Sequence, residues 1–323
     1  MNRIWHLYAL YAVLGLGYTA VAPPTINKLV TAWFVRRRGL ALSIASSGGA
    51  LGELVLVPVA MASVTLTSWE ASYRLLAILL VVISIPVAFL LRNRPQDMGL
   101  LPDGGAAAPA GQAKVEARDE GIRDALRSPA FWQLGLGFFV CGYTMSVVNV
   151  HFIPYATDRG LSEMLAAVAM GSIGLSSVVG SITFGVLSDR YGRKNFLALV
   201  YVLRGVAFGL LLWTHNAPQL FFAAAVLGVS WTATTPLTSA LIADRYSLRR
   251  LGTIFGALFA FMPIGSGVGS ALAGYLYDLT GGYTISFISN VAMGLLAGGV
   301  VFFVKEPARD LLTRRPVEAR VAP

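Results

Sequence analysis

The densest group of regularly spaced charges in this chain is a ten-residue turn between two long apolar stretches. The turn covers residues 185–194 and reads Gly-Val-Leu-Ser-Asp-Arg-Tyr-Gly-Arg-Lys. Its charged members are Asp189, Arg190, Arg193 and Lys194. Carboxylate and guanidinium groups this close together form charge-assisted hydrogen bonds, and Gly192 predicts a break between two helices. A turn that is merely basic does not require this order of Gly, Asp and Arg, so the spacing indicates a specific role.

Two charged side chains, Glu53 and Arg204, lie inside apolar stretches. An ionisable group in the core of a bilayer is costly, and it usually faces a cavity or a polar partner. Glu53 could carry a proton or make a structural hydrogen bond between helices. Arg204 could attract an anion or could be structural. Both residues are candidates for a solute-binding site.

Three further residues bring polar or aromatic groups into apolar stretches. His151, two residues after Asn149, could bind a solute or exchange a proton, or it could be a hydrogen-bonding residue at the membrane surface. Trp231, which has threonines beside it, could contact a solute or pack in the core. Pro236 in the same stretch and Pro263 in the following one predict kinks near a cavity.

The composition places the chain in a membrane. Of its 323 residues, 56% are hydrophobic and 13% are charged, and the mean hydropathy is +0.67. A soluble domain has about 25% charged residues. The net charge of +9 could suggest a nucleic-acid partner, but the basic residues are spread between apolar stretches. That distribution is typical of membrane topology signals.

The residue types also argue against an enzyme or an ATP-driven pump. Cys141 is the only cysteine, which excludes a disulfide within the chain and a thiolate metal cluster. The sequence contains no His and Cys cluster with metal-site spacing. It also has no Gly-Lys dipeptide and therefore no phosphate-binding loop of the common type. We expect no catalytic residue, no cofactor, no metal and no nucleic acid.

Nine stretches are long and apolar enough to cross a bilayer core about 30 Å thick, which takes about 20 residues. Each must be helical, because a strand with open edges cannot satisfy its backbone groups in lipid. The predicted fold class is therefore an all-α integral membrane protein with nine transmembrane helices. The spans are residues 5–32, 40–64, 72–91, 131–155, 163–187, 195–213, 218–243, 252–277 and 283–304.

Glycines four residues apart predict where these helices pack closely. The pairs are Gly252/Gly256, Gly265/Gly269 and Gly294/Gly298. We expect them to form contacts between helices rather than contacts with a solute.

The basic residues also predict the orientation, because cytoplasmic loops are enriched in Lys and Arg. With a cytoplasmic C-terminus, 21 of the 25 basic residues lie in cytoplasmic loops, three lie outside, and Arg204 stays in the membrane. We therefore expect an outside N-terminus and a cytoplasmic turn at 185–194. The membrane is predicted to be the inner (plasma) membrane of a bacterium.

The chain is predicted to divide at a long cytoplasmic loop. Residues 1–97 form a partial N-terminal bundle of three helices, 98–129 a cytoplasmic linker, 130–305 a C-terminal bundle of six helices, and 306–323 a cytoplasmic tail. A repeat of landmarks at 212 residues pairs Pro24 with Pro236 and Arg38 with Arg250. Residues 130–212 have no counterpart in this repeat. The sequence therefore predicts a twelve-helix architecture that lacks its first three helices.

The turn at 185–194 resembles the signature loop of the major facilitator superfamily, Gly-x-Leu-Ser/Thr-Asp-Arg-x-Gly-Arg-Lys/Arg, and is called the signature loop below. Its matching residues are Gly185, Asp189, Arg190, Gly192, Arg193 and Lys194. The resemblance implies a secondary transporter in which this cytoplasmic loop locks neighbouring helices in one of two transport states. It also places Arg204 on a peripheral helix, which favours the structural alternative for that residue.

Four other stretches are similar to the monocarboxylate and oxalate/formate porters of that superfamily. They are residues 33–41, 129–132, 151–160 and 274–283. Porters of this group often use a basic residue in the eighth or eleventh helix, whereas the matching spans 163–187 and 252–277 contain no Lys or Arg.

The predicted function is transport of a small solute by alternating access. The resemblance implies an organic anion such as a monocarboxylate, with protons as candidate co-transported ions. The predicted binding residues are His151, Asn149, Trp231, Arg204 and Glu53. We expect a monomer surrounded by lipid. Two alternatives stay open, namely a transport-inactive, truncated membrane protein with a scaffold or sensor role, and efflux of hydrophobic compounds.

Overall fold

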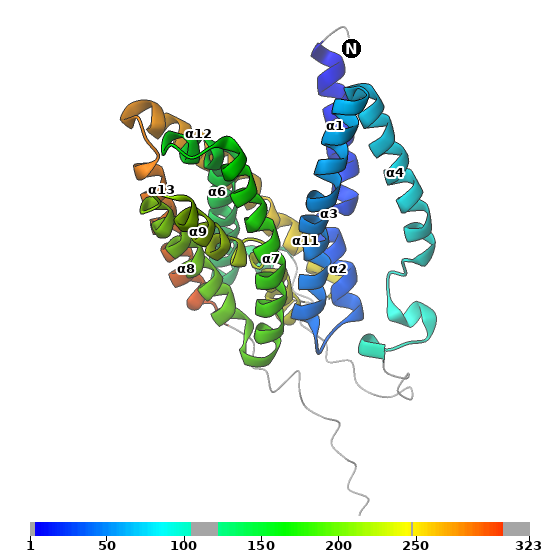
Figure 1. Ribbon diagram of the computed structural model, residues 1–323. Helices are drawn as coiled ribbons and strands as arrows, with labels where there is room; N and C mark the ends of the chain where they lie inside the picture. Colours follow the sequence, from blue (N-terminus) through cyan, green and yellow to red (C-terminus); the bar gives the residue numbers. More distant parts are fainter. Residues whose placement is uncertain (1–3, 105–121, 247, 306–323) are drawn as a thin grey trace, which may run out of the picture.

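A computed structural model describes residues 4–104, 122–246 and 248–305 (Figure 1). Within these ranges the chain folds into helices joined by short connections, and it forms no β-sheet. The prediction of an all-α protein is confirmed.

The N-terminal helix group contains four α-helices. They are α1 (Ile4–Val21), α2 (Pro23–Trp33), α3 (Arg38–Leu66) and α4 (Trp69–Leu90). Ser68 caps α4, because its hydroxyl accepts a hydrogen bond from the backbone N–H of Ala71 at 3.2 Å. Two 3₁₀ turns, η1 (Pro95–Met98) and η2 (Pro102–Gly104), follow α4.

The short helix α5 (Ile122–Arg127) lies within the predicted linker 98–129. Residues 105–121 of that linker and the predicted tail 306–323 lie outside the described residues. The helices of the C-terminal group follow: α6 (Pro129–Asp158), α7 (Glu163–Tyr191), α8 (Arg193–Leu212), α9 (Ala217–Val229), α10 (Thr234–Arg245), α11 (Leu248–Phe259), α12 (Phe261–Thr280) and α13 (Thr284–Phe302).

Eight helical segments of the described residues are long and apolar enough to cross a membrane, and they match eight of the nine predicted spans. The span predicted at 40–64 forms α3, which is not among the eight. Its 29 residues nevertheless exceed the about 20 that a bilayer crossing requires. Three of the eight segments consist of two helices each, α1 with α2, α9 with α10, and α11 with α12.

A proline lies in the first turn of the second helix at all three interruptions, and α2 begins at Pro23. Pro236 and Pro263 lie in the first turns of α10 and α12. Proline lacks the N–H that would bond the carbonyl four residues earlier, and its ring crowds that carbonyl. The helices are interrupted just before each proline, at residues 230–233 and at Ala260. The two predicted kinks are confirmed.

Glycines join α12 closely to α6. A Cβ atom at Gly265 would lie 2.0 Å from the carbonyl oxygen of Phe139, and a Cβ at Gly269 would lie 2.4 Å from that of Tyr143. Only residues without a side chain allow the two backbones to approach this far. The close packing predicted for this glycine pair is confirmed.

The other two glycine pairs differ from each other. Cβ atoms at Gly294 and Gly298 would lie 2.7 Å and 2.6 Å from atoms of α8, which confirms that prediction. A Cβ at Gly252 would lie 3.2 Å from the Lys28 side chain on α2, whereas a Cβ at Gly256 would meet no atom within 4 Å. The prediction of close packing therefore holds at Gly252 and is wrong at Gly256. Spacing alone does not decide which helix face has a neighbour.

The positions of helix ends agree with the predicted repeat. Helix α2 ends at Trp33 and α10 ends at Arg245, 212 residues later. Helices α4 and α13 end at Leu90 and Phe302, which are separated by the same 212 residues. Corresponding helices therefore stop at corresponding points of the two groups.

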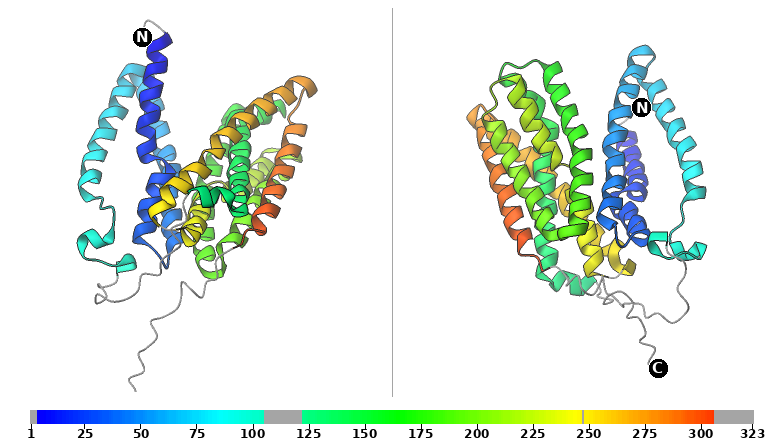
Figure 2. Two further views of the ribbon diagram at one scale, coloured as in Figure 1. Left: turned by 180° about the vertical axis from the view of Figure 1, so that it is seen from behind. Right: turned by 60° about the horizontal axis from the view of Figure 1, so that its bottom comes forward.

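The two helix groups are close at one end and apart at the other (Figures 1 and 2). At the close end, a Cβ at Gly39 on α3 would lie 2.6 Å from the carbonyl oxygen of Gly185 on α7. Further along α7, Gly174 lies on the same face as Gly185, eleven residues away, and has no neighbouring atom within 4 Å. Helices α3 and α7 thus diverge. We call the end with Gly39 and Gly185 the closed end and the opposite end the open end.

Candidate functional site

A carboxylate of the signature loop joins the two helix groups at the closed end. Asp189, near the end of α7, accepts hydrogen bonds from the backbone N–H groups of Gly39 at 2.8 Å and Leu40 at 3.0 Å. These N–H groups lie in the first turn of α3, where no carbonyl of the same helix can accept from them. The residue before α3, Arg37, makes no side-chain cap. Asp189 therefore supplies the negative cap of α3 from the other helix group.

Asp244, near the end of α10, links two arginines at the same place. One carboxylate oxygen accepts from Arg38 Nη1 at 2.6 Å, and the other accepts from Arg193 Nε at 2.7 Å. Arg193 also lies 3.5 Å from Asp189. We call these four residues the ionic cluster. Their side chains are 6–10% exposed and their formal charges cancel, as charges buried in a protein require.

Two glycines bring the backbones together beside the ionic cluster. A Cβ at Gly185 would lie 2.4 Å from the hydroxyl oxygen of Ser43 and 2.7 Å from the carbonyl oxygen of Gly39. A larger residue at either glycine would push α3 away from α7. The carboxylate of Asp189 would then lose its reach to the start of α3.

The rest of the signature loop surrounds this contact. Gly192 ends α7 with φ 110°, a backbone angle that favours glycine, and the predicted helix break is confirmed. The guanidinium of Arg190 lies 5.3 Å from the ring centre of Tyr191. The ammonium of Lys194 lies 5.6 Å from the ring centre of Phe302.

Arg38 and Asp244 are not among the site residues predicted from the sequence. In the sequence, Arg38 forms part of a basic cluster that indicates topology. Asp244 carried a usable signal, because it is the only acidic residue between the spans 218–243 and 252–277. A single carboxylate among arginines at a helix end indicates an ion pair.

A second carboxylate holds the same α2–α3 turn from within the N-terminal group. Asp103 of η2 accepts hydrogen bonds from the backbone N–H groups of Val35 at 3.2 Å and Arg36 at 3.0 Å. The turn is therefore held on one side by its own group and on the other side by Asp189. Of these two contacts, only the one made by Asp189 must break if the groups separate.

Arg204 and Trp231, two predicted binding residues, lie together. The Arg204 side chain is fully buried, and its guanidinium lies 5.9 Å from the ring centre of Trp231. One of its Nη2 bonds goes to the carbonyl oxygen of Trp231 at 2.8 Å. This placement favours the structural alternative for Arg204.

His151 lies nearer the open end, on α6. Its Nε2 is 3.2 Å from the carbonyl oxygen of Ser270, and its Nδ1 is 3.3 Å from the hydroxyl oxygen of Tyr283. Asn149, two residues earlier, is exposed and therefore points to a different side of the helix. Glu53 belongs to α3, and its side chain lies outside the described residues.

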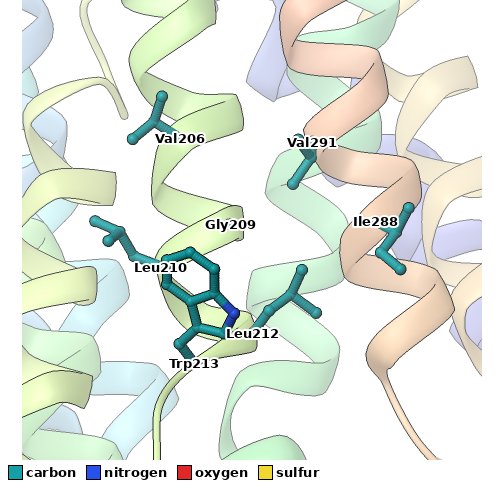
Figure 3. Close-up of a pocket in the computed structure, with 7 residues that line it drawn as sticks. All are labelled: Val206, Gly209, Leu210, Leu212, Trp213, Ile288 and Val291. Carbon is teal, nitrogen blue, oxygen red and sulfur yellow. The ribbon is translucent and has the colours of Figure 1, made fainter.

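An apolar cavity of about 370 Å³ lies between α8 and α13, away from these residues (Figure 3). Its lining is Val206, Gly209, Leu210, Leu212, Trp213, Ile288 and Val291. The lining contains no charged side chain, so this cavity offers nothing to recognise an ionic solute. Among the described residues, no group of three His, Cys, Asp or Glu side chains could hold a metal ion.

Known proteins resemble this chain along most of its length. It is 26% identical to an uncharacterized MFS-type transporter, YcxA, of Bacillus subtilis over 94% of this chain and 74% of that protein. It is 28% identical to monocarboxylate transporter 12 of the rat over 88% of this chain. This chain spans 63% of the length of the rat protein. The oxalate:formate antiporter of Oxalobacter formigenes is 24% identical over 98% of this chain and 74% of that protein.

The fold has a counterpart among solved structures. The structure of the human organic anion transporter MFSD10 superposes with a TM-score of 0.66 at 17% identity, over 86% of this chain and 67% of that one. A family profile, described as Major Facilitator Superfamily, matches residues 1–183 and 134–323. These two matches together cover the whole sequence. The chain belongs to the major facilitator superfamily.

Proposed function

We propose that this chain takes part in secondary active transport of a small organic anion, such as a monocarboxylate, by alternating access. The observation that carries the proposal is the ionic cluster, which ties the two helix groups together at one end while α3 and α7 diverge toward the other. A transporter of this kind must close one side of the membrane while the other is open. Charge-assisted hydrogen bonds between groups can hold such a state and can be exchanged for water.

The closed end is proposed to face the cytoplasm. The signature loop and the basic residues Arg36, Arg37 and Arg38 lie there, and a cytoplasmic position agrees with the enrichment of Lys and Arg on that side. The described arrangement then corresponds to a state open to the outside. The C-terminus would lie in the cytoplasm of a bacterial cell.

The solute class is proposed from the relatives. Two of them are named for carboxylates, a monocarboxylate transporter and an oxalate:formate antiporter. The test is uptake of radiolabelled lactate, formate and oxalate by the 323-residue chain in proteoliposomes, with and without an inward proton gradient. Saturable uptake of one carboxylate is the expected result. Uptake of hydrophobic dyes in place of carboxylates, or no uptake by folded protein, would reject this solute class.

His151 is proposed as the site where a proton is exchanged. A carbonyl oxygen can only accept, so Nε2 donates to Ser270, and Nδ1 of the neutral ring accepts from the Tyr283 hydroxyl. A proton arriving at Nδ1 would reverse the second bond without breaking either. Tyr283, the partner of His151, lies near Tyr155 and Asp158 of α6 and near Tyr277 and Asp278 of α12. Arg159 lies near Tyr155.

Replacing His151 with glutamine is expected to remove the stimulation of uptake by a proton gradient. The amide can still donate to the Ser270 carbonyl, but it cannot take up a proton near neutral pH. Carboxylate exchange without a gradient should continue. The measurement compares initial uptake rates at acidic and neutral external pH, with the exposed His215→Gln as the control. Unchanged proton dependence in His151→Gln would remove His151 from the mechanism.

A further inference from the structure

The span formed by α9 and α10 is interrupted in the middle of the C-terminal group. Helix α9 ends at Val229 and α10 begins at Thr234. Carbonyl groups at such an interruption lose their partners four residues later. Pro236 adds to the loss, because it has no N–H to donate. An interrupted helix inside a membrane needs other donors to satisfy these carbonyls.

Arg204 supplies those donors from α8. Its Nη2 donates to the carbonyl oxygens of Ser230 and, at 2.8 Å, of Trp231, which are two carbonyls of the interruption. Its Nη1 contacts Cys141 Sγ at 3.2 Å and Thr144 Oγ1 at 3.4 Å, both on α6. The guanidinium thus connects α8, α6 and the junction of α9 with α10.

Neutral groups, rather than a carboxylate, stabilise the charged side chain of Arg204. All four of its hydrogen-bond partners are neutral, and the side chain is fully buried. The C-terminal end of α9 carries a partial negative charge that favours a cation there. The rings of Trp231 and Tyr201, centred 5.9 Å and 6.0 Å away, add cation–π attraction. These contacts fix the position of the guanidinium group, which in turn fixes the two carbonyls that it holds.

The direction of α10 matters because its far end carries the ionic cluster. Asp244 lies ten residues after Thr234, or about 15 Å along the helix at 1.5 Å per residue. A change of about 10° at the junction would move Asp244 by about 2.6 Å over that lever. A donor–acceptor distance of about 3.6 Å is no longer a hydrogen bond. The 2.6 Å and 2.7 Å bonds to Arg38 and Arg193 would not survive such a shift.

We propose that Arg204 is a positioning residue that fixes the α9–α10 junction and thereby keeps Asp244 in reach of Arg38 and Arg193. The role rests on the proposed function in one respect, since closure at this end matters only if the protein transports. Arginine is required because lysine has a single ammonium without a planar fork. Lysine would keep the charge and lose the simultaneous contacts with the carbonyls and with α6.

The first test uses the chain's only cysteine as a reporter of the junction. Cys141 is 1% exposed and touches both Arg204 and Thr234 of α10, at 3.2 Å each. In Arg204→Lys and Arg204→Gln, the labelling of Cys141 by N-ethylmaleimide is expected to be about tenfold faster than in the parent, because the junction opens locally. The control is Val206→Ala on the same helix, which lines the apolar cavity and does not touch the junction.

The second test reports on the closed end at a distance from Arg204. Ser43 is fully buried beside Gly185. In the background Cys141→Ala with Ser43→Cys, the new thiol should be protected with Arg204 present. It should label about tenfold faster in Arg204→Lys, although no residue of the ionic cluster is changed. If Arg204 only stabilised the C-terminal group, its replacement would expose Cys141 and leave Ser43→Cys protected.

Each outcome decides the proposal. Protection of Ser43→Cys in folded Arg204→Lys and Arg204→Gln proteins would overturn the positioning role. Equal acceleration in Val206→Ala would overturn it as well, because the effect would then be general loosening. Failure of both Arg204 variants to fold would show that the residue serves folding itself. Neither labelling test needs a solute, so absent uptake with intact labelling differences would reject the transport proposal and keep the positioning role.

Discussion

Replacing Asp189 with alanine is expected to slow transport about 100-fold while the protein stays folded and in the membrane. The carboxylate accepts two backbone hydrogen bonds at the start of α3 and faces Arg193. Its removal leaves two N–H groups of α3 uncapped and weakens the ionic cluster. Taking one partner from a buried ionic contact costs about 3–5 kcal/mol. The state with a sealed closed end would then be too rare to complete the cycle.

The effect of Asp189→Ala should come from the contact between helix groups, and Asp103→Ala is the matched control. Asp103 caps the same α2–α3 turn with two similar hydrogen bonds, but within its own group. Its loss should reduce stability slightly and leave the transport rate within about threefold of the parent. Initial uptake rates in proteoliposomes, normalised to folded protein by gel filtration, measure both. Parental turnover in Asp189→Ala, or equal losses in the two variants, would reduce the signature loop to a topology signal.

The helices and two of their three interruptions could be predicted from sequence because each depends on local chemistry. Long apolar stretches become helices, since no other open structure satisfies the backbone in lipid. Pro236 and Pro263 interrupt their spans because a missing N–H acts on the carbonyl four residues earlier. Gly192 ends α7 because its φ of 110° suits glycine. None of these conclusions needs information about distant parts of the chain.

The candidate site could be predicted only in part, because its contacts join distant residues. Arg38 and Asp244 are 206 residues apart, and no local pattern links them. The partners of Asp189 are backbone N–H groups, which every residue except proline possesses and which leave no mark in a sequence. The signature loop identified Asp189 and Arg193 as important without indicating what they touch.

Arg204 shows the same limit for the prediction of a solute-binding residue. A charge inside an apolar stretch indicates a polar partner, but the sequence does not say whether that partner is a solute or the protein. Here the partners include two carbonyls of an interrupted helix. The interruption is predictable from Pro236, whereas the approach of α8 to it depends on the packing of three helices.

Gly265→Ala is expected to cause the largest loss of stability among single changes to a small residue in α12. A Cβ there would lie 2.0 Å from the carbonyl oxygen of Phe139 and 2.8 Å from its carbonyl carbon. Both atoms belong to the backbone of α6 and cannot turn aside like the end of a side chain. The two helices would have to separate, and overpacking of this kind costs about 3 kcal/mol.

Gly267→Ala, two residues along the same helix, separates this packing effect from helix propensity. A Cβ at Gly267 would meet no atom within 4 Å, and the residue is exposed. Alanine favours a helix over glycine by about 1 kcal/mol, so Gly267→Ala should be neutral or slightly stabilising. Thermal unfolding in detergent, followed by the loss of monodisperse protein, measures both variants. Helix propensity predicts the same gain in stability for Gly265→Ala and Gly267→Ala, and only the neighbouring carbonyl of Phe139 distinguishes the two positions. Equal melting temperatures for the two variants would therefore mean that the packing of α6 on α12 does not depend on backbone contact at Gly265.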